Sequence, residues 1–446
     1  MTFSGALNGL VMHAGRGAPD RLLRLVGRLP QPMLDWLRGS ALRRTVRLVG
    51  RRSRFYREKF ASLGIRPGRV RRLSDLARCF TTPEELRAAG PEDLLCGTPD
   101  TVIESSGTTG RLTRIYLSRQ ELEYAAWQGI IFFAMVGIGA RDRILGAFDY
   151  SWGLGGIYTE RILTHSGLFG VCPGLVDPQE AVDRLLAHRF TVVIADPFWL
   201  ARFTEVAMAR GIRTPMTAFI SGAERITEHL RAQIEGYWRA PVYMSYGSTE
   251  LGATLGGECR AKQGYHLNEY DFAVEVVDTD EEGYGEVVFT TLNRSVMPLI
   301  RYRTRDVARL IHEPCACGLP FRRLSPIRGR TDEVIACVWG DVHPDLFADL
   351  LRGAPGIGDE WQVALTQPGL SPVFEFRLEA DGGTEVRDPI IRHIHQRLAR
   401  QYPPLWAKLQ QRMCDIQVRI QPAGSVRTGR KLRRLVDERD SPKASE

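Results

Sequence analysis

Residues 104–114 combine glycines, hydroxyl side chains and arginines, residue types that together can hold a polyphosphate. The centre of this stretch reads Ser105-Ser106-Gly107-Thr108-Thr109-Gly110. Glycines let the backbone turn tightly and expose its N–H groups, hydroxyls add donors, and arginines add positive charge. No Gly-Lys-Ser/Thr follows at the spacing of a P-loop. The stretch therefore predicts a phosphate-binding loop of another kind, with an ordinary Ser/Thr/Gly-rich hairpin turn as the alternative.

A second segment whose residue types could take part in chemistry is Tyr246-Gly247-Ser248-Thr249-Glu250, which follows a predicted strand. The aromatic ring can stack on a base and Thr249 can bond a phosphate. The carboxylate of Glu250 can hold Mg²⁺. The alternative is a simple turn before a helix.

Three later residues supply further charges. Asp306 offers a carboxylate for ribose hydroxyls, and Arg330 adds a cation beside a glycine turn. Lys431 lies in a basic run near the C-terminus, where the alternative is one more solvated cation.

Four residues form a candidate metal set: Cys259, His266, Cys315 and Cys317. Three thiols and one imidazole suit a closed tetrahedral site for structural Zn²⁺, and four protein ligands leave no open position for catalysis. The alternative is that the thiols are small buried apolar groups. The other cysteines are isolated, which favours a reducing compartment over a disulfide framework.

The elements that position these residues follow from the apolar pattern. Between about residues 140 and 250, strand candidates at 143–148, 168–172, 192–196 and 217–222 alternate with helical stretches. This alternation predicts a parallel sheet covered by helices. Ligands of such sheets sit beyond the carboxyl ends of the strands, where the loops 149–153, 221–224 and 245–250 fall.

The rest of the chain predicts three further units. Residues 1–75 look helical, residues 268–312 form a small antiparallel sheet, and residues 333–446 form a compact α+β unit. The fold class is therefore α/β, with a large N-terminal domain over residues 1–331 and a small C-terminal domain over residues 332–446.

Bulk properties indicate an ordinary globular protein of the cytoplasm. The 446 residues are 25% charged, and no apolar run approaches the roughly 20 residues that span a bilayer. No signal peptide is evident. The formal charge of +8 suits an anionic substrate. The arginine-rich region 43–72 favours a solvated amphipathic helix face over a nucleic-acid patch, so neither nucleic acid nor membrane insertion is expected.

The order of the motifs resembles the adenylate-forming superfamily, and within it the phenylacetate–coenzyme A ligase group. The resemblance rests on Ser-Ser-Gly-Thr-Thr-Gly, Gly-Ala-Glu, Tyr-Gly-x-Thr-Glu, Tyr-Arg-Thr-x-Asp, Gly-Arg-x-Asp and a late lysine, over about residues 50–440. It implies a mobile C-terminal domain and a two-step reaction. A carboxylate first attacks the α-phosphate of ATP to give an acyl-AMP, and a thiol, usually that of coenzyme A, then takes the acyl group.

The resemblance also implies individual roles. The loop residues Ser105, Ser106, Thr108 and Thr109 would hold the β- and γ-phosphates, with Gly107 and Gly110 shaping the loop. The adenine would be framed by Gly222, Ala223, Glu224 and Tyr246. Thr249 would contact the α-phosphate, and Glu250 would bind Mg²⁺. Asp306 and Arg330 would bind the ribose. Asp332 would be the hinge of the C-terminal domain, and Lys431 would bridge the substrate carboxylate and the α-phosphate.

Three positions depart from the family pattern. Arg305 stands where much of the superfamily has glycine, and Leu112 stands where proline is common. Arg430 replaces the glycine expected before the lysine, which leaves the alignment of Lys431 open.

The acyl pocket is expected around Phe148, Tyr150, Trp152 and Gly153, whose aromatic rings suggest a small flat or apolar acid; plain core packing is the alternative. ATP, Mg²⁺, coenzyme A and structural Zn²⁺ are the expected cofactors and co-substrates. Two rival functions stay open: transfer of the acyl group to an amine or a carrier-protein thiol, and a zinc-stabilised nucleotide-binding scaffold without turnover. A homodimer is also left open.

Overall fold

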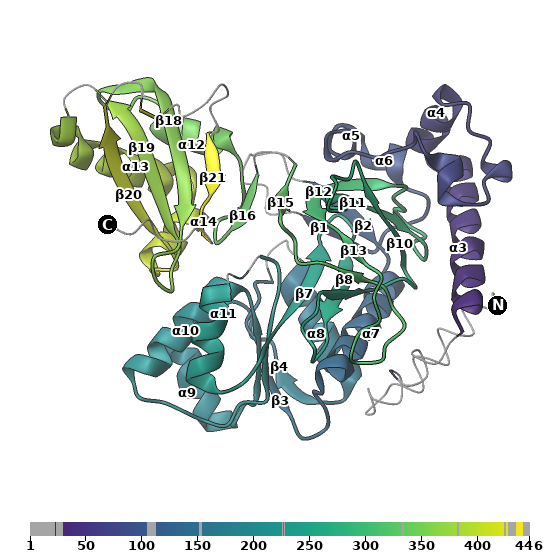
Figure 1. Cartoon of the computed structure of the whole chain (residues 1–446), viewed down its shortest axis with the longest axis horizontal. Coiled ribbons are helices and arrows are strands. Elements are labelled where there is room, and N and C mark those ends of the chain that lie inside the picture. Colours follow the sequence, from purple (N-terminus) through teal and green to yellow (C-terminus); the bar gives the residue numbers. More distant parts are fainter. Residues whose placement is uncertain are drawn as a thin grey trace.

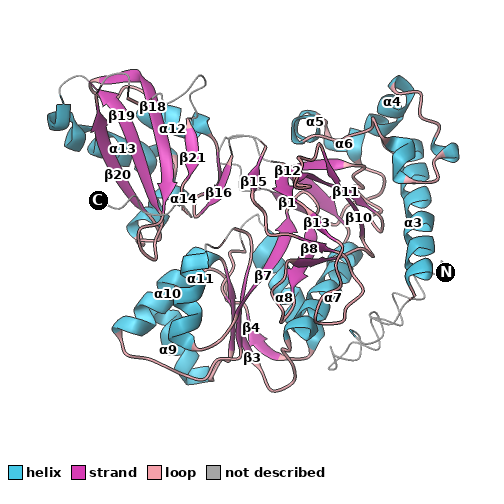
Figure 2. Cartoon of the chain, in the orientation of Figure 1, coloured by secondary structure: helices cyan, strands magenta, loops and turns pink. Residues whose placement is uncertain are grey.

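The computed structural model of the protein describes residue 23 and residues 30–104, 113–150, 154–224, 226, 228–331, 334–380, 383–422, 425–426 and 434–439. Its elements fall into a larger group that ends near residue 330 and a smaller group that begins near residue 335 (Figures 1 and 2). Among the described residues, no helix is both long enough and apolar enough to cross a membrane.

The larger group is built on a nine-stranded mixed sheet. Its strands follow in the order β13 (Leu310–Ile311), β14 (Arg323–Leu324), β9 (Tyr265–Leu267), β8 (Ala253–Glu258), β7 (Val242–Ser248), β6 (Ala218–Ser221), β5 (Val192–Ala195), β3 (Arg143–Gly146) and β4 (Phe169–Val171). The pairs from β7 to β4 are parallel, which confirms the predicted parallel sheet. The pairs from β13 to β7 are antiparallel.

Five helices cover this sheet: α7 (Arg119–Val136), α8 (Leu154–Ser166), α9 (Pro178–His188), α10 (Pro197–Ala209) and α11 (Glu228–Trp238). Figure 1 shows α9, α10 and α11 on one side of the parallel strands and α7 and α8 on the other. Helix α10 begins after Asp196, whose carboxylate accepts hydrogen bonds from the N–H groups of Phe198 and Trp199. This cap satisfies donors that a helix start leaves unpaired.

A second, antiparallel sheet has the order β10 (Phe272–Val277), β11 (Gly285–Thr291), β12 (Tyr302–Ala308) and β15 (Gly329–Arg330). It confirms the antiparallel sheet predicted over residues 268–312. The last strand pairs through two residues only, and its register places Arg330 opposite Asp306.

A separate hairpin joins β1 (Thr101–Glu104) and β2 (Arg114–Leu117), with Glu104 opposite Arg114. A salt bridge of 2.9 Å between these two side chains closes the base of the connecting segment. The predicted phosphate loop, residues 105–110, is part of that connecting segment, residues 105–113, and lies outside the described residues.

The N-terminal layer consists of α3 (Gln31–Arg52), α4 (Arg54–Ser62), two short 3-10 helices, η1 (Pro67–Arg69) and η2 (Leu73–Leu76), and the helices α5 (Pro83–Ala88) and α6 (Pro91–Leu94). Its core surrounds Tyr56, which is fully buried. The Tyr56 hydroxyl accepts a hydrogen bond from the Ile300 N–H at 2.9 Å, which attaches the layer to the antiparallel sheet region.

The smaller group contains a two-stranded sheet, β16 (Ile335–Cys337) and β17 (Gly340–Val342), and a four-stranded sheet. The latter has the order β20 (Asp415–Gln421), β19 (Val373–Ala380), β18 (Ile357–Thr366) and β21 (Leu435–Asp437). Its helices are α12 (Pro344–Leu351), α13 (Arg387–Gln401) and α14 (Pro403–Gln410). The α+β composition matches the expectation for this part of the chain. Asp332, the expected hinge, lies outside the described residues.

Candidate active site

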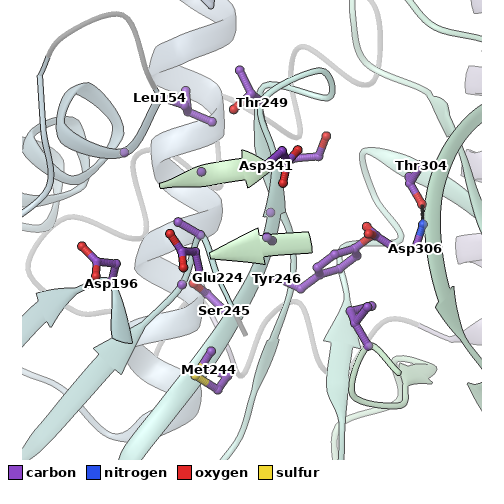
Figure 3. Close-up of a pocket in the computed structure, with 18 of the residues that line it drawn as sticks. Leu154, Asp196, Glu224, Met244, Ser245, Tyr246, Thr249, Thr304, Asp306 and Asp341 are labelled. Atoms are coloured by element: carbon purple, nitrogen blue, oxygen red, sulfur yellow. Dashed lines mark hydrogen bonds between the residues drawn. The ribbon is translucent and has the colours of Figure 1, made fainter. Parts of the chain in front are cut away.

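A cavity of about 1870 Å³ lies between the two groups of elements. Residues of the larger group, including Tyr246 and Asp306, line it together with residues of the smaller group, including Asp341 and Lys408. Figure 3 shows part of this lining, with the Tyr246 side chain directed at Asp306. Most of the residues in the predicted motifs that the structure describes therefore meet at one site.

The predicted ribose-binding residues form a connected polar group. The Tyr246 hydroxyl donates a hydrogen bond of 2.6 Å to Asp306. The Arg330 guanidinium lies 3.7 Å from the Asp306 carboxylate and 3.6 Å from that of Asp341. Burial raises the pKa of Asp306 to about 6, and the nearby Asp341 charge contributes to the rise, while Arg330 and the Tyr246 hydrogen bond act against it. Asp306 is thus a carboxylate at neutral pH, able to accept hydrogen bonds from two vicinal hydroxyls.

The predicted adenine wall follows the end of β6. Gly222 permits a close approach to Ser245, because a Cβ at this position would collide with that side chain. Ala223 adopts φ 68°, the left-handed region that disfavours a residue with a Cβ. Backbone strain of this kind persists at binding loops, where the surrounding structure holds the residue in place.

Glu224, the last residue of this wall, has a carboxylate group in an unusual environment. One of its buried carboxylate oxygens has no hydrogen-bond partner among the described residues. Burial and the neighbouring Asp196 carboxylate raise the pKa of Glu224 well above its usual range, while Lys408 and Arg439 partly offset this effect. Figure 3 shows Asp196 and Glu224 side by side at the cavity. The unsatisfied oxygen identifies this wall as a place where a ligand can complete the hydrogen bonding.

Thr249 and Glu250 follow β7 and both line the cavity. The Ser248 hydroxyl donates a hydrogen bond of 2.8 Å to Glu250, which orients the carboxylate. The next element is the antiparallel strand β8, not a helix, so the alternative of a simple pre-helical turn is wrong. Glu104 and Thr113, at the two ends of the segment that contains the predicted phosphate loop, also line the cavity.

An apolar arm extends the cavity between α7, α8 and the sheet. We define it by Phe132, Phe133, Phe148, Tyr158, Ile162 and Met244. Phe148 was expected in the acyl pocket. The structure does not bring Tyr150 to this cavity: its hydroxyl donates to the Cys172 carbonyl at 2.8 Å, beside β4. Trp152 and Gly153 lie outside the described residues.

Sequence reasoning missed the α7 and α8 members of the arm and also missed Lys408. The signal in α7 is its apolar character on nearly all sides, which marks a helix enclosed by protein. Lys408 gives no such signal, because an isolated lysine is normally a solvated cation. Lys431, the expected catalytic lysine, lies outside the described residues.

The four predicted metal ligands come together at the antiparallel end of the large sheet. Cys259 follows β8, His266 lies in β9, and Cys315 and Cys317 precede β14; the four ligand atoms lie within 4.8 Å of one another. The sulfurs of Cys259 and Cys315 are 3.6 Å apart, close to the roughly 3.8 Å between sulfurs in a tetrahedron with 2.3 Å zinc–sulfur bonds. Burial lowers the pKa of His266 to about 4, so the imidazole is neutral and can donate a lone pair.

Comparisons with known proteins place this geometry in a family. The model of the AMP-binding enzyme family matches residues 74–289. The phenylacetate-coenzyme A ligase of Thermus thermophilus is 30% identical over 390 residues, which cover 82% of this chain and 85% of that protein. The ligase of the same name from Aromatoleum evansii is 26% identical, with 73% of this chain and 76% of that protein covered.

Solved structures agree on the fold. A crystal structure of 2-hydroxyisobutyryl-CoA ligase in complex with 2-HIB-AMP and CoA superposes with a TM-score of 0.77 over 92% of this chain and 91% of that chain, at 20% identity. Another crystal structure of that ligase, in the postadenylation state, gives a TM-score of 0.66.

The chain belongs to the adenylate-forming AMP-binding enzymes, in the phenylacetate-coenzyme A ligase group. It is an AMP-forming acid–thiol ligase. The expected family and fold class are confirmed.

Proposed function

We propose that the protein activates a small aromatic or apolar carboxylic acid with ATP and then transfers the acyl group to coenzyme A. The observation that carries the proposal is the continuity of one cavity. The polar group of Tyr246, Asp306 and Arg330 lies in the same cavity as the apolar arm and both ends of the segment that contains the predicted phosphate loop. A nucleotide and an apolar acid can therefore meet there.

The nucleotide roles follow from the chemistry of each position. The Tyr246 ring and the segment 222–224 form a wall for the adenine, and Asp306 and Arg330 face the ribose. Residues 105–110 hold the pyrophosphate that leaves. Glu250 is the residue that would hold Mg²⁺, which neutralises phosphate charge when bound.

The first chemical step is an in-line displacement. The substrate carboxylate oxygen forms a bond to the α-phosphorus while the bond from that phosphorus to the β-phosphate oxygen breaks, and pyrophosphate leaves with both electrons. The protein contributes positioning and charge stabilisation. We assign α-phosphate contact to Thr249 and the bridging cation to Lys431.

The acid preference follows from the apolar arm. Phenylalanine rings from α7 and Phe148, together with Ile162 and Met244, are apolar, and Arg231, which also lines the cavity, is already paired with Glu258. An acid with a second carboxylate would leave that group desolvated and unpaired in the arm, at a cost of several kcal/mol. A flat aromatic or apolar acid avoids this cost.

In the second step the thiol sulfur, having lost its proton, forms a bond to the acyl carbonyl carbon while the bond from that carbon to the phosphate oxygen breaks, and AMP leaves. We propose that residues 1–331 and 332–446 are two domains, that Asp332 is the hinge between them, and that Lys431 is withdrawn when the smaller domain turns. The salt bridge from Asp341 to Arg330 joins the smaller group to a nucleotide-site residue in the orientation described, and a turn of the smaller domain would break it. A carrier-protein thiol or an amine as acceptor is the competing proposal.

We also propose that Cys259, His266, Cys315 and Cys317 hold a structural Zn²⁺. The donor set and spacing support this, and four protein ligands leave no coordination position for substrate.

Carboxylate-dependent pyrophosphate exchange over a panel of acids tests the first step. We expect exchange with aromatic or apolar acids and little with dicarboxylates of similar length. Coenzyme A, then candidate carrier proteins and amines, would be added to separate the acceptors by the product formed. Absence of exchange with every acid in a broad panel would favour the scaffold without turnover. A homodimer stays a prediction.

A further inference from the structure

The N-terminal layer carries a concentration of positive charge that the active site does not use. Residues 31–80 contain 14 Arg and Lys but three Asp and Glu, a formal net charge of +11, whereas the whole chain carries +8. The remainder of the chain is therefore net acidic. Charge of one sign on one layer creates a potential that attracts a polyanionic partner.

Eleven arginines of this layer are exposed, and we call them the arginine surface: Arg44, Arg47, Arg51, Arg52, Arg54, Arg57, Arg66, Arg69, Arg71, Arg72 and Arg78. Two of them, Arg54 and Arg72, pair with carboxylates. The other nine make no ion pair with any residue that the structure describes. Most of this charge is therefore free to act on a partner.

The arginine surface is held together by the packing of its elements. Helix α3 buries Leu34, Leu42, Val46 and Val49 against the protein, which leaves Arg47 and Arg51 on its outer side. The 3-10 turn η1 packs closely on α3, because a Cβ added at Gly50 would meet the Pro67 ring. Figure 1 shows α3 along the outer edge of the molecule, at the end opposite to β18, β19 and β20.

The arginines of this surface suit oxyanions that accept paired hydrogen bonds. Every exposed cation of this layer is an arginine; its one lysine, Lys59, is turned inward to Glu85. A guanidinium presents a planar fork of donors that matches phosphate and carboxylate oxygens, whereas an ammonium acts as a point charge. A surface that displays many phosphates is a partner of this kind.

Two observations favour a lipid bilayer over a nucleic acid. Trp36 is 59% exposed and lies on the same face of α3 as Arg43 and Arg47, seven and eleven residues further on. An indole beside arginines is typical of the bilayer interface. The charges also extend from α3 onto α4 and η1, while a nucleic-acid groove about 12 Å wide admits one helix. A flat bilayer can contact all three elements at once.

We infer that the arginine surface docks the enzyme on an anionic phospholipid membrane, with the headgroup phosphates as ligands and Trp36 at the headgroup level. The apolar face of α3 is already buried in the protein, so docking is peripheral and electrostatic. The smaller group of elements, at the other end of the molecule, stays free of the membrane.

Vesicle co-sedimentation of the full chain tests this inference. We expect binding to vesicles of phosphatidylglycerol and phosphatidylcholine in equal parts, little binding to phosphatidylcholine alone, and loss of binding between about 0.1 M and about 1 M salt. Each arginine near an anionic surface contributes about five-fold to partition. The variant Arg47→Gln with Arg51→Gln should therefore bind about 25-fold more weakly, with unchanged pyrophosphate exchange.

The matched control is Arg392→Gln with Arg400→Gln, which removes two exposed arginines from α13 in the smaller group; it should bind vesicles as the wild type does. Trp36→Ala should weaken vesicle binding and leave binding to duplex DNA unchanged. Equal binding to neutral vesicles, or an equal loss in both arginine variants, would overturn the inference. If duplex DNA at the same phosphate concentration removed the protein from the vesicles, the surface would be a nucleic-acid site instead.

Discussion

Asp306 should control how the affinity for the nucleoside depends on pH. Its pKa of about 6 means that the fraction in the carboxylate form falls about ten-fold between pH 7 and pH 5. A carboxylate accepts hydrogen bonds from both ribose hydroxyls, while a protonated carboxyl has less accepting capacity. Adenosine suits the measurement, because it has no group that titrates in this range. We expect its dissociation constant, measured by calorimetry, to rise over that interval by up to about ten-fold, the limit reached when only the carboxylate form binds.

The neighbours of Asp306 give this prediction a sign that can be checked. The charge of Asp341 raises the pKa of Asp306, so Asp341→Asn should move the midpoint to lower pH. Asp345→Asn is the control, because Asp345 is an exposed carboxylate four residues further on, in α12. Asp306→Asn should bind adenosine more weakly and without a midpoint. A flat wild-type profile from pH 5 to pH 8, or a midpoint that Asp341→Asn moves upward, would refute the assignment.

The contribution of Asp306 to folding stability should fall as the pH rises, whereas its contribution to nucleoside affinity should grow. The folded-state pKa of Asp306 lies above the ordinary value of about 3.9. Its protonation therefore stabilises the fold fully below about pH 4, and this contribution is lost as the pH rises through about 6. Thermal unfolding of the wild type and Asp306→Asn should differ in pH dependence over that window, with the variant lacking this contribution. The pH that suits ribose binding is thus the pH at which Asp306 least favours folding.

Three further outcomes are expected. Arg305 adopts φ 70° and pairs with Glu84 at 2.9 Å. Arg305→Gly and Arg305→Ala both lose that pair, but only glycine relieves the backbone strain, so thermal unfolding should show the glycine variant to be more stable than the alanine variant by about 1 kcal/mol. Equal stability of the two variants would exclude strain at this position. Metal analysis should find about one zinc per chain, and Cys315→Ser should lose it and unfold at lower temperature; a fully folded wild type free of zinc would contradict the site. Lys431→Ala should abolish pyrophosphate exchange while ATP still binds, and unchanged exchange would assign the bridging role to another lysine.

Motif chemistry made much of the site predictable from the sequence. Tyr246 was expected at the end of a strand, Asp306 in the segment predicted as an antiparallel sheet, and Arg330 beside a glycine turn; all three line the cavity. The metal set was predictable because thiols and an imidazole have few other reasons to recur around a Cys-x-Cys turn. These predictions depended on local sequence motifs and on the order of the elements along the chain.

Other parts depended on contacts between distant segments. The apolar arm is formed by residues of α7, α8 and β7. In the sequence, an apolar helix residue that faces a substrate cannot be distinguished from one that faces the protein core. Lys408 becomes part of the cavity only because α14 packs near it. Tyr150 illustrates the converse: it is an aromatic residue in a predicted site loop, and its hydroxyl instead bonds the Cys172 carbonyl.

The stack of Tyr265 on Tyr246, with ring centroids 5.9 Å apart, connects two sites that have been described separately. Tyr265 precedes the metal-set residue His266 in β9, and the Tyr246 hydroxyl holds Asp306. The two rings thus form a packed contact between the Cys/His set and the proposed ribose site. Thermodynamic linkage is reciprocal: if filling one site changes the affinity of the other by some factor, the reverse effect has the same factor. With the proposed zinc bound, the nucleotide affinity measured before and after chelation would give that factor.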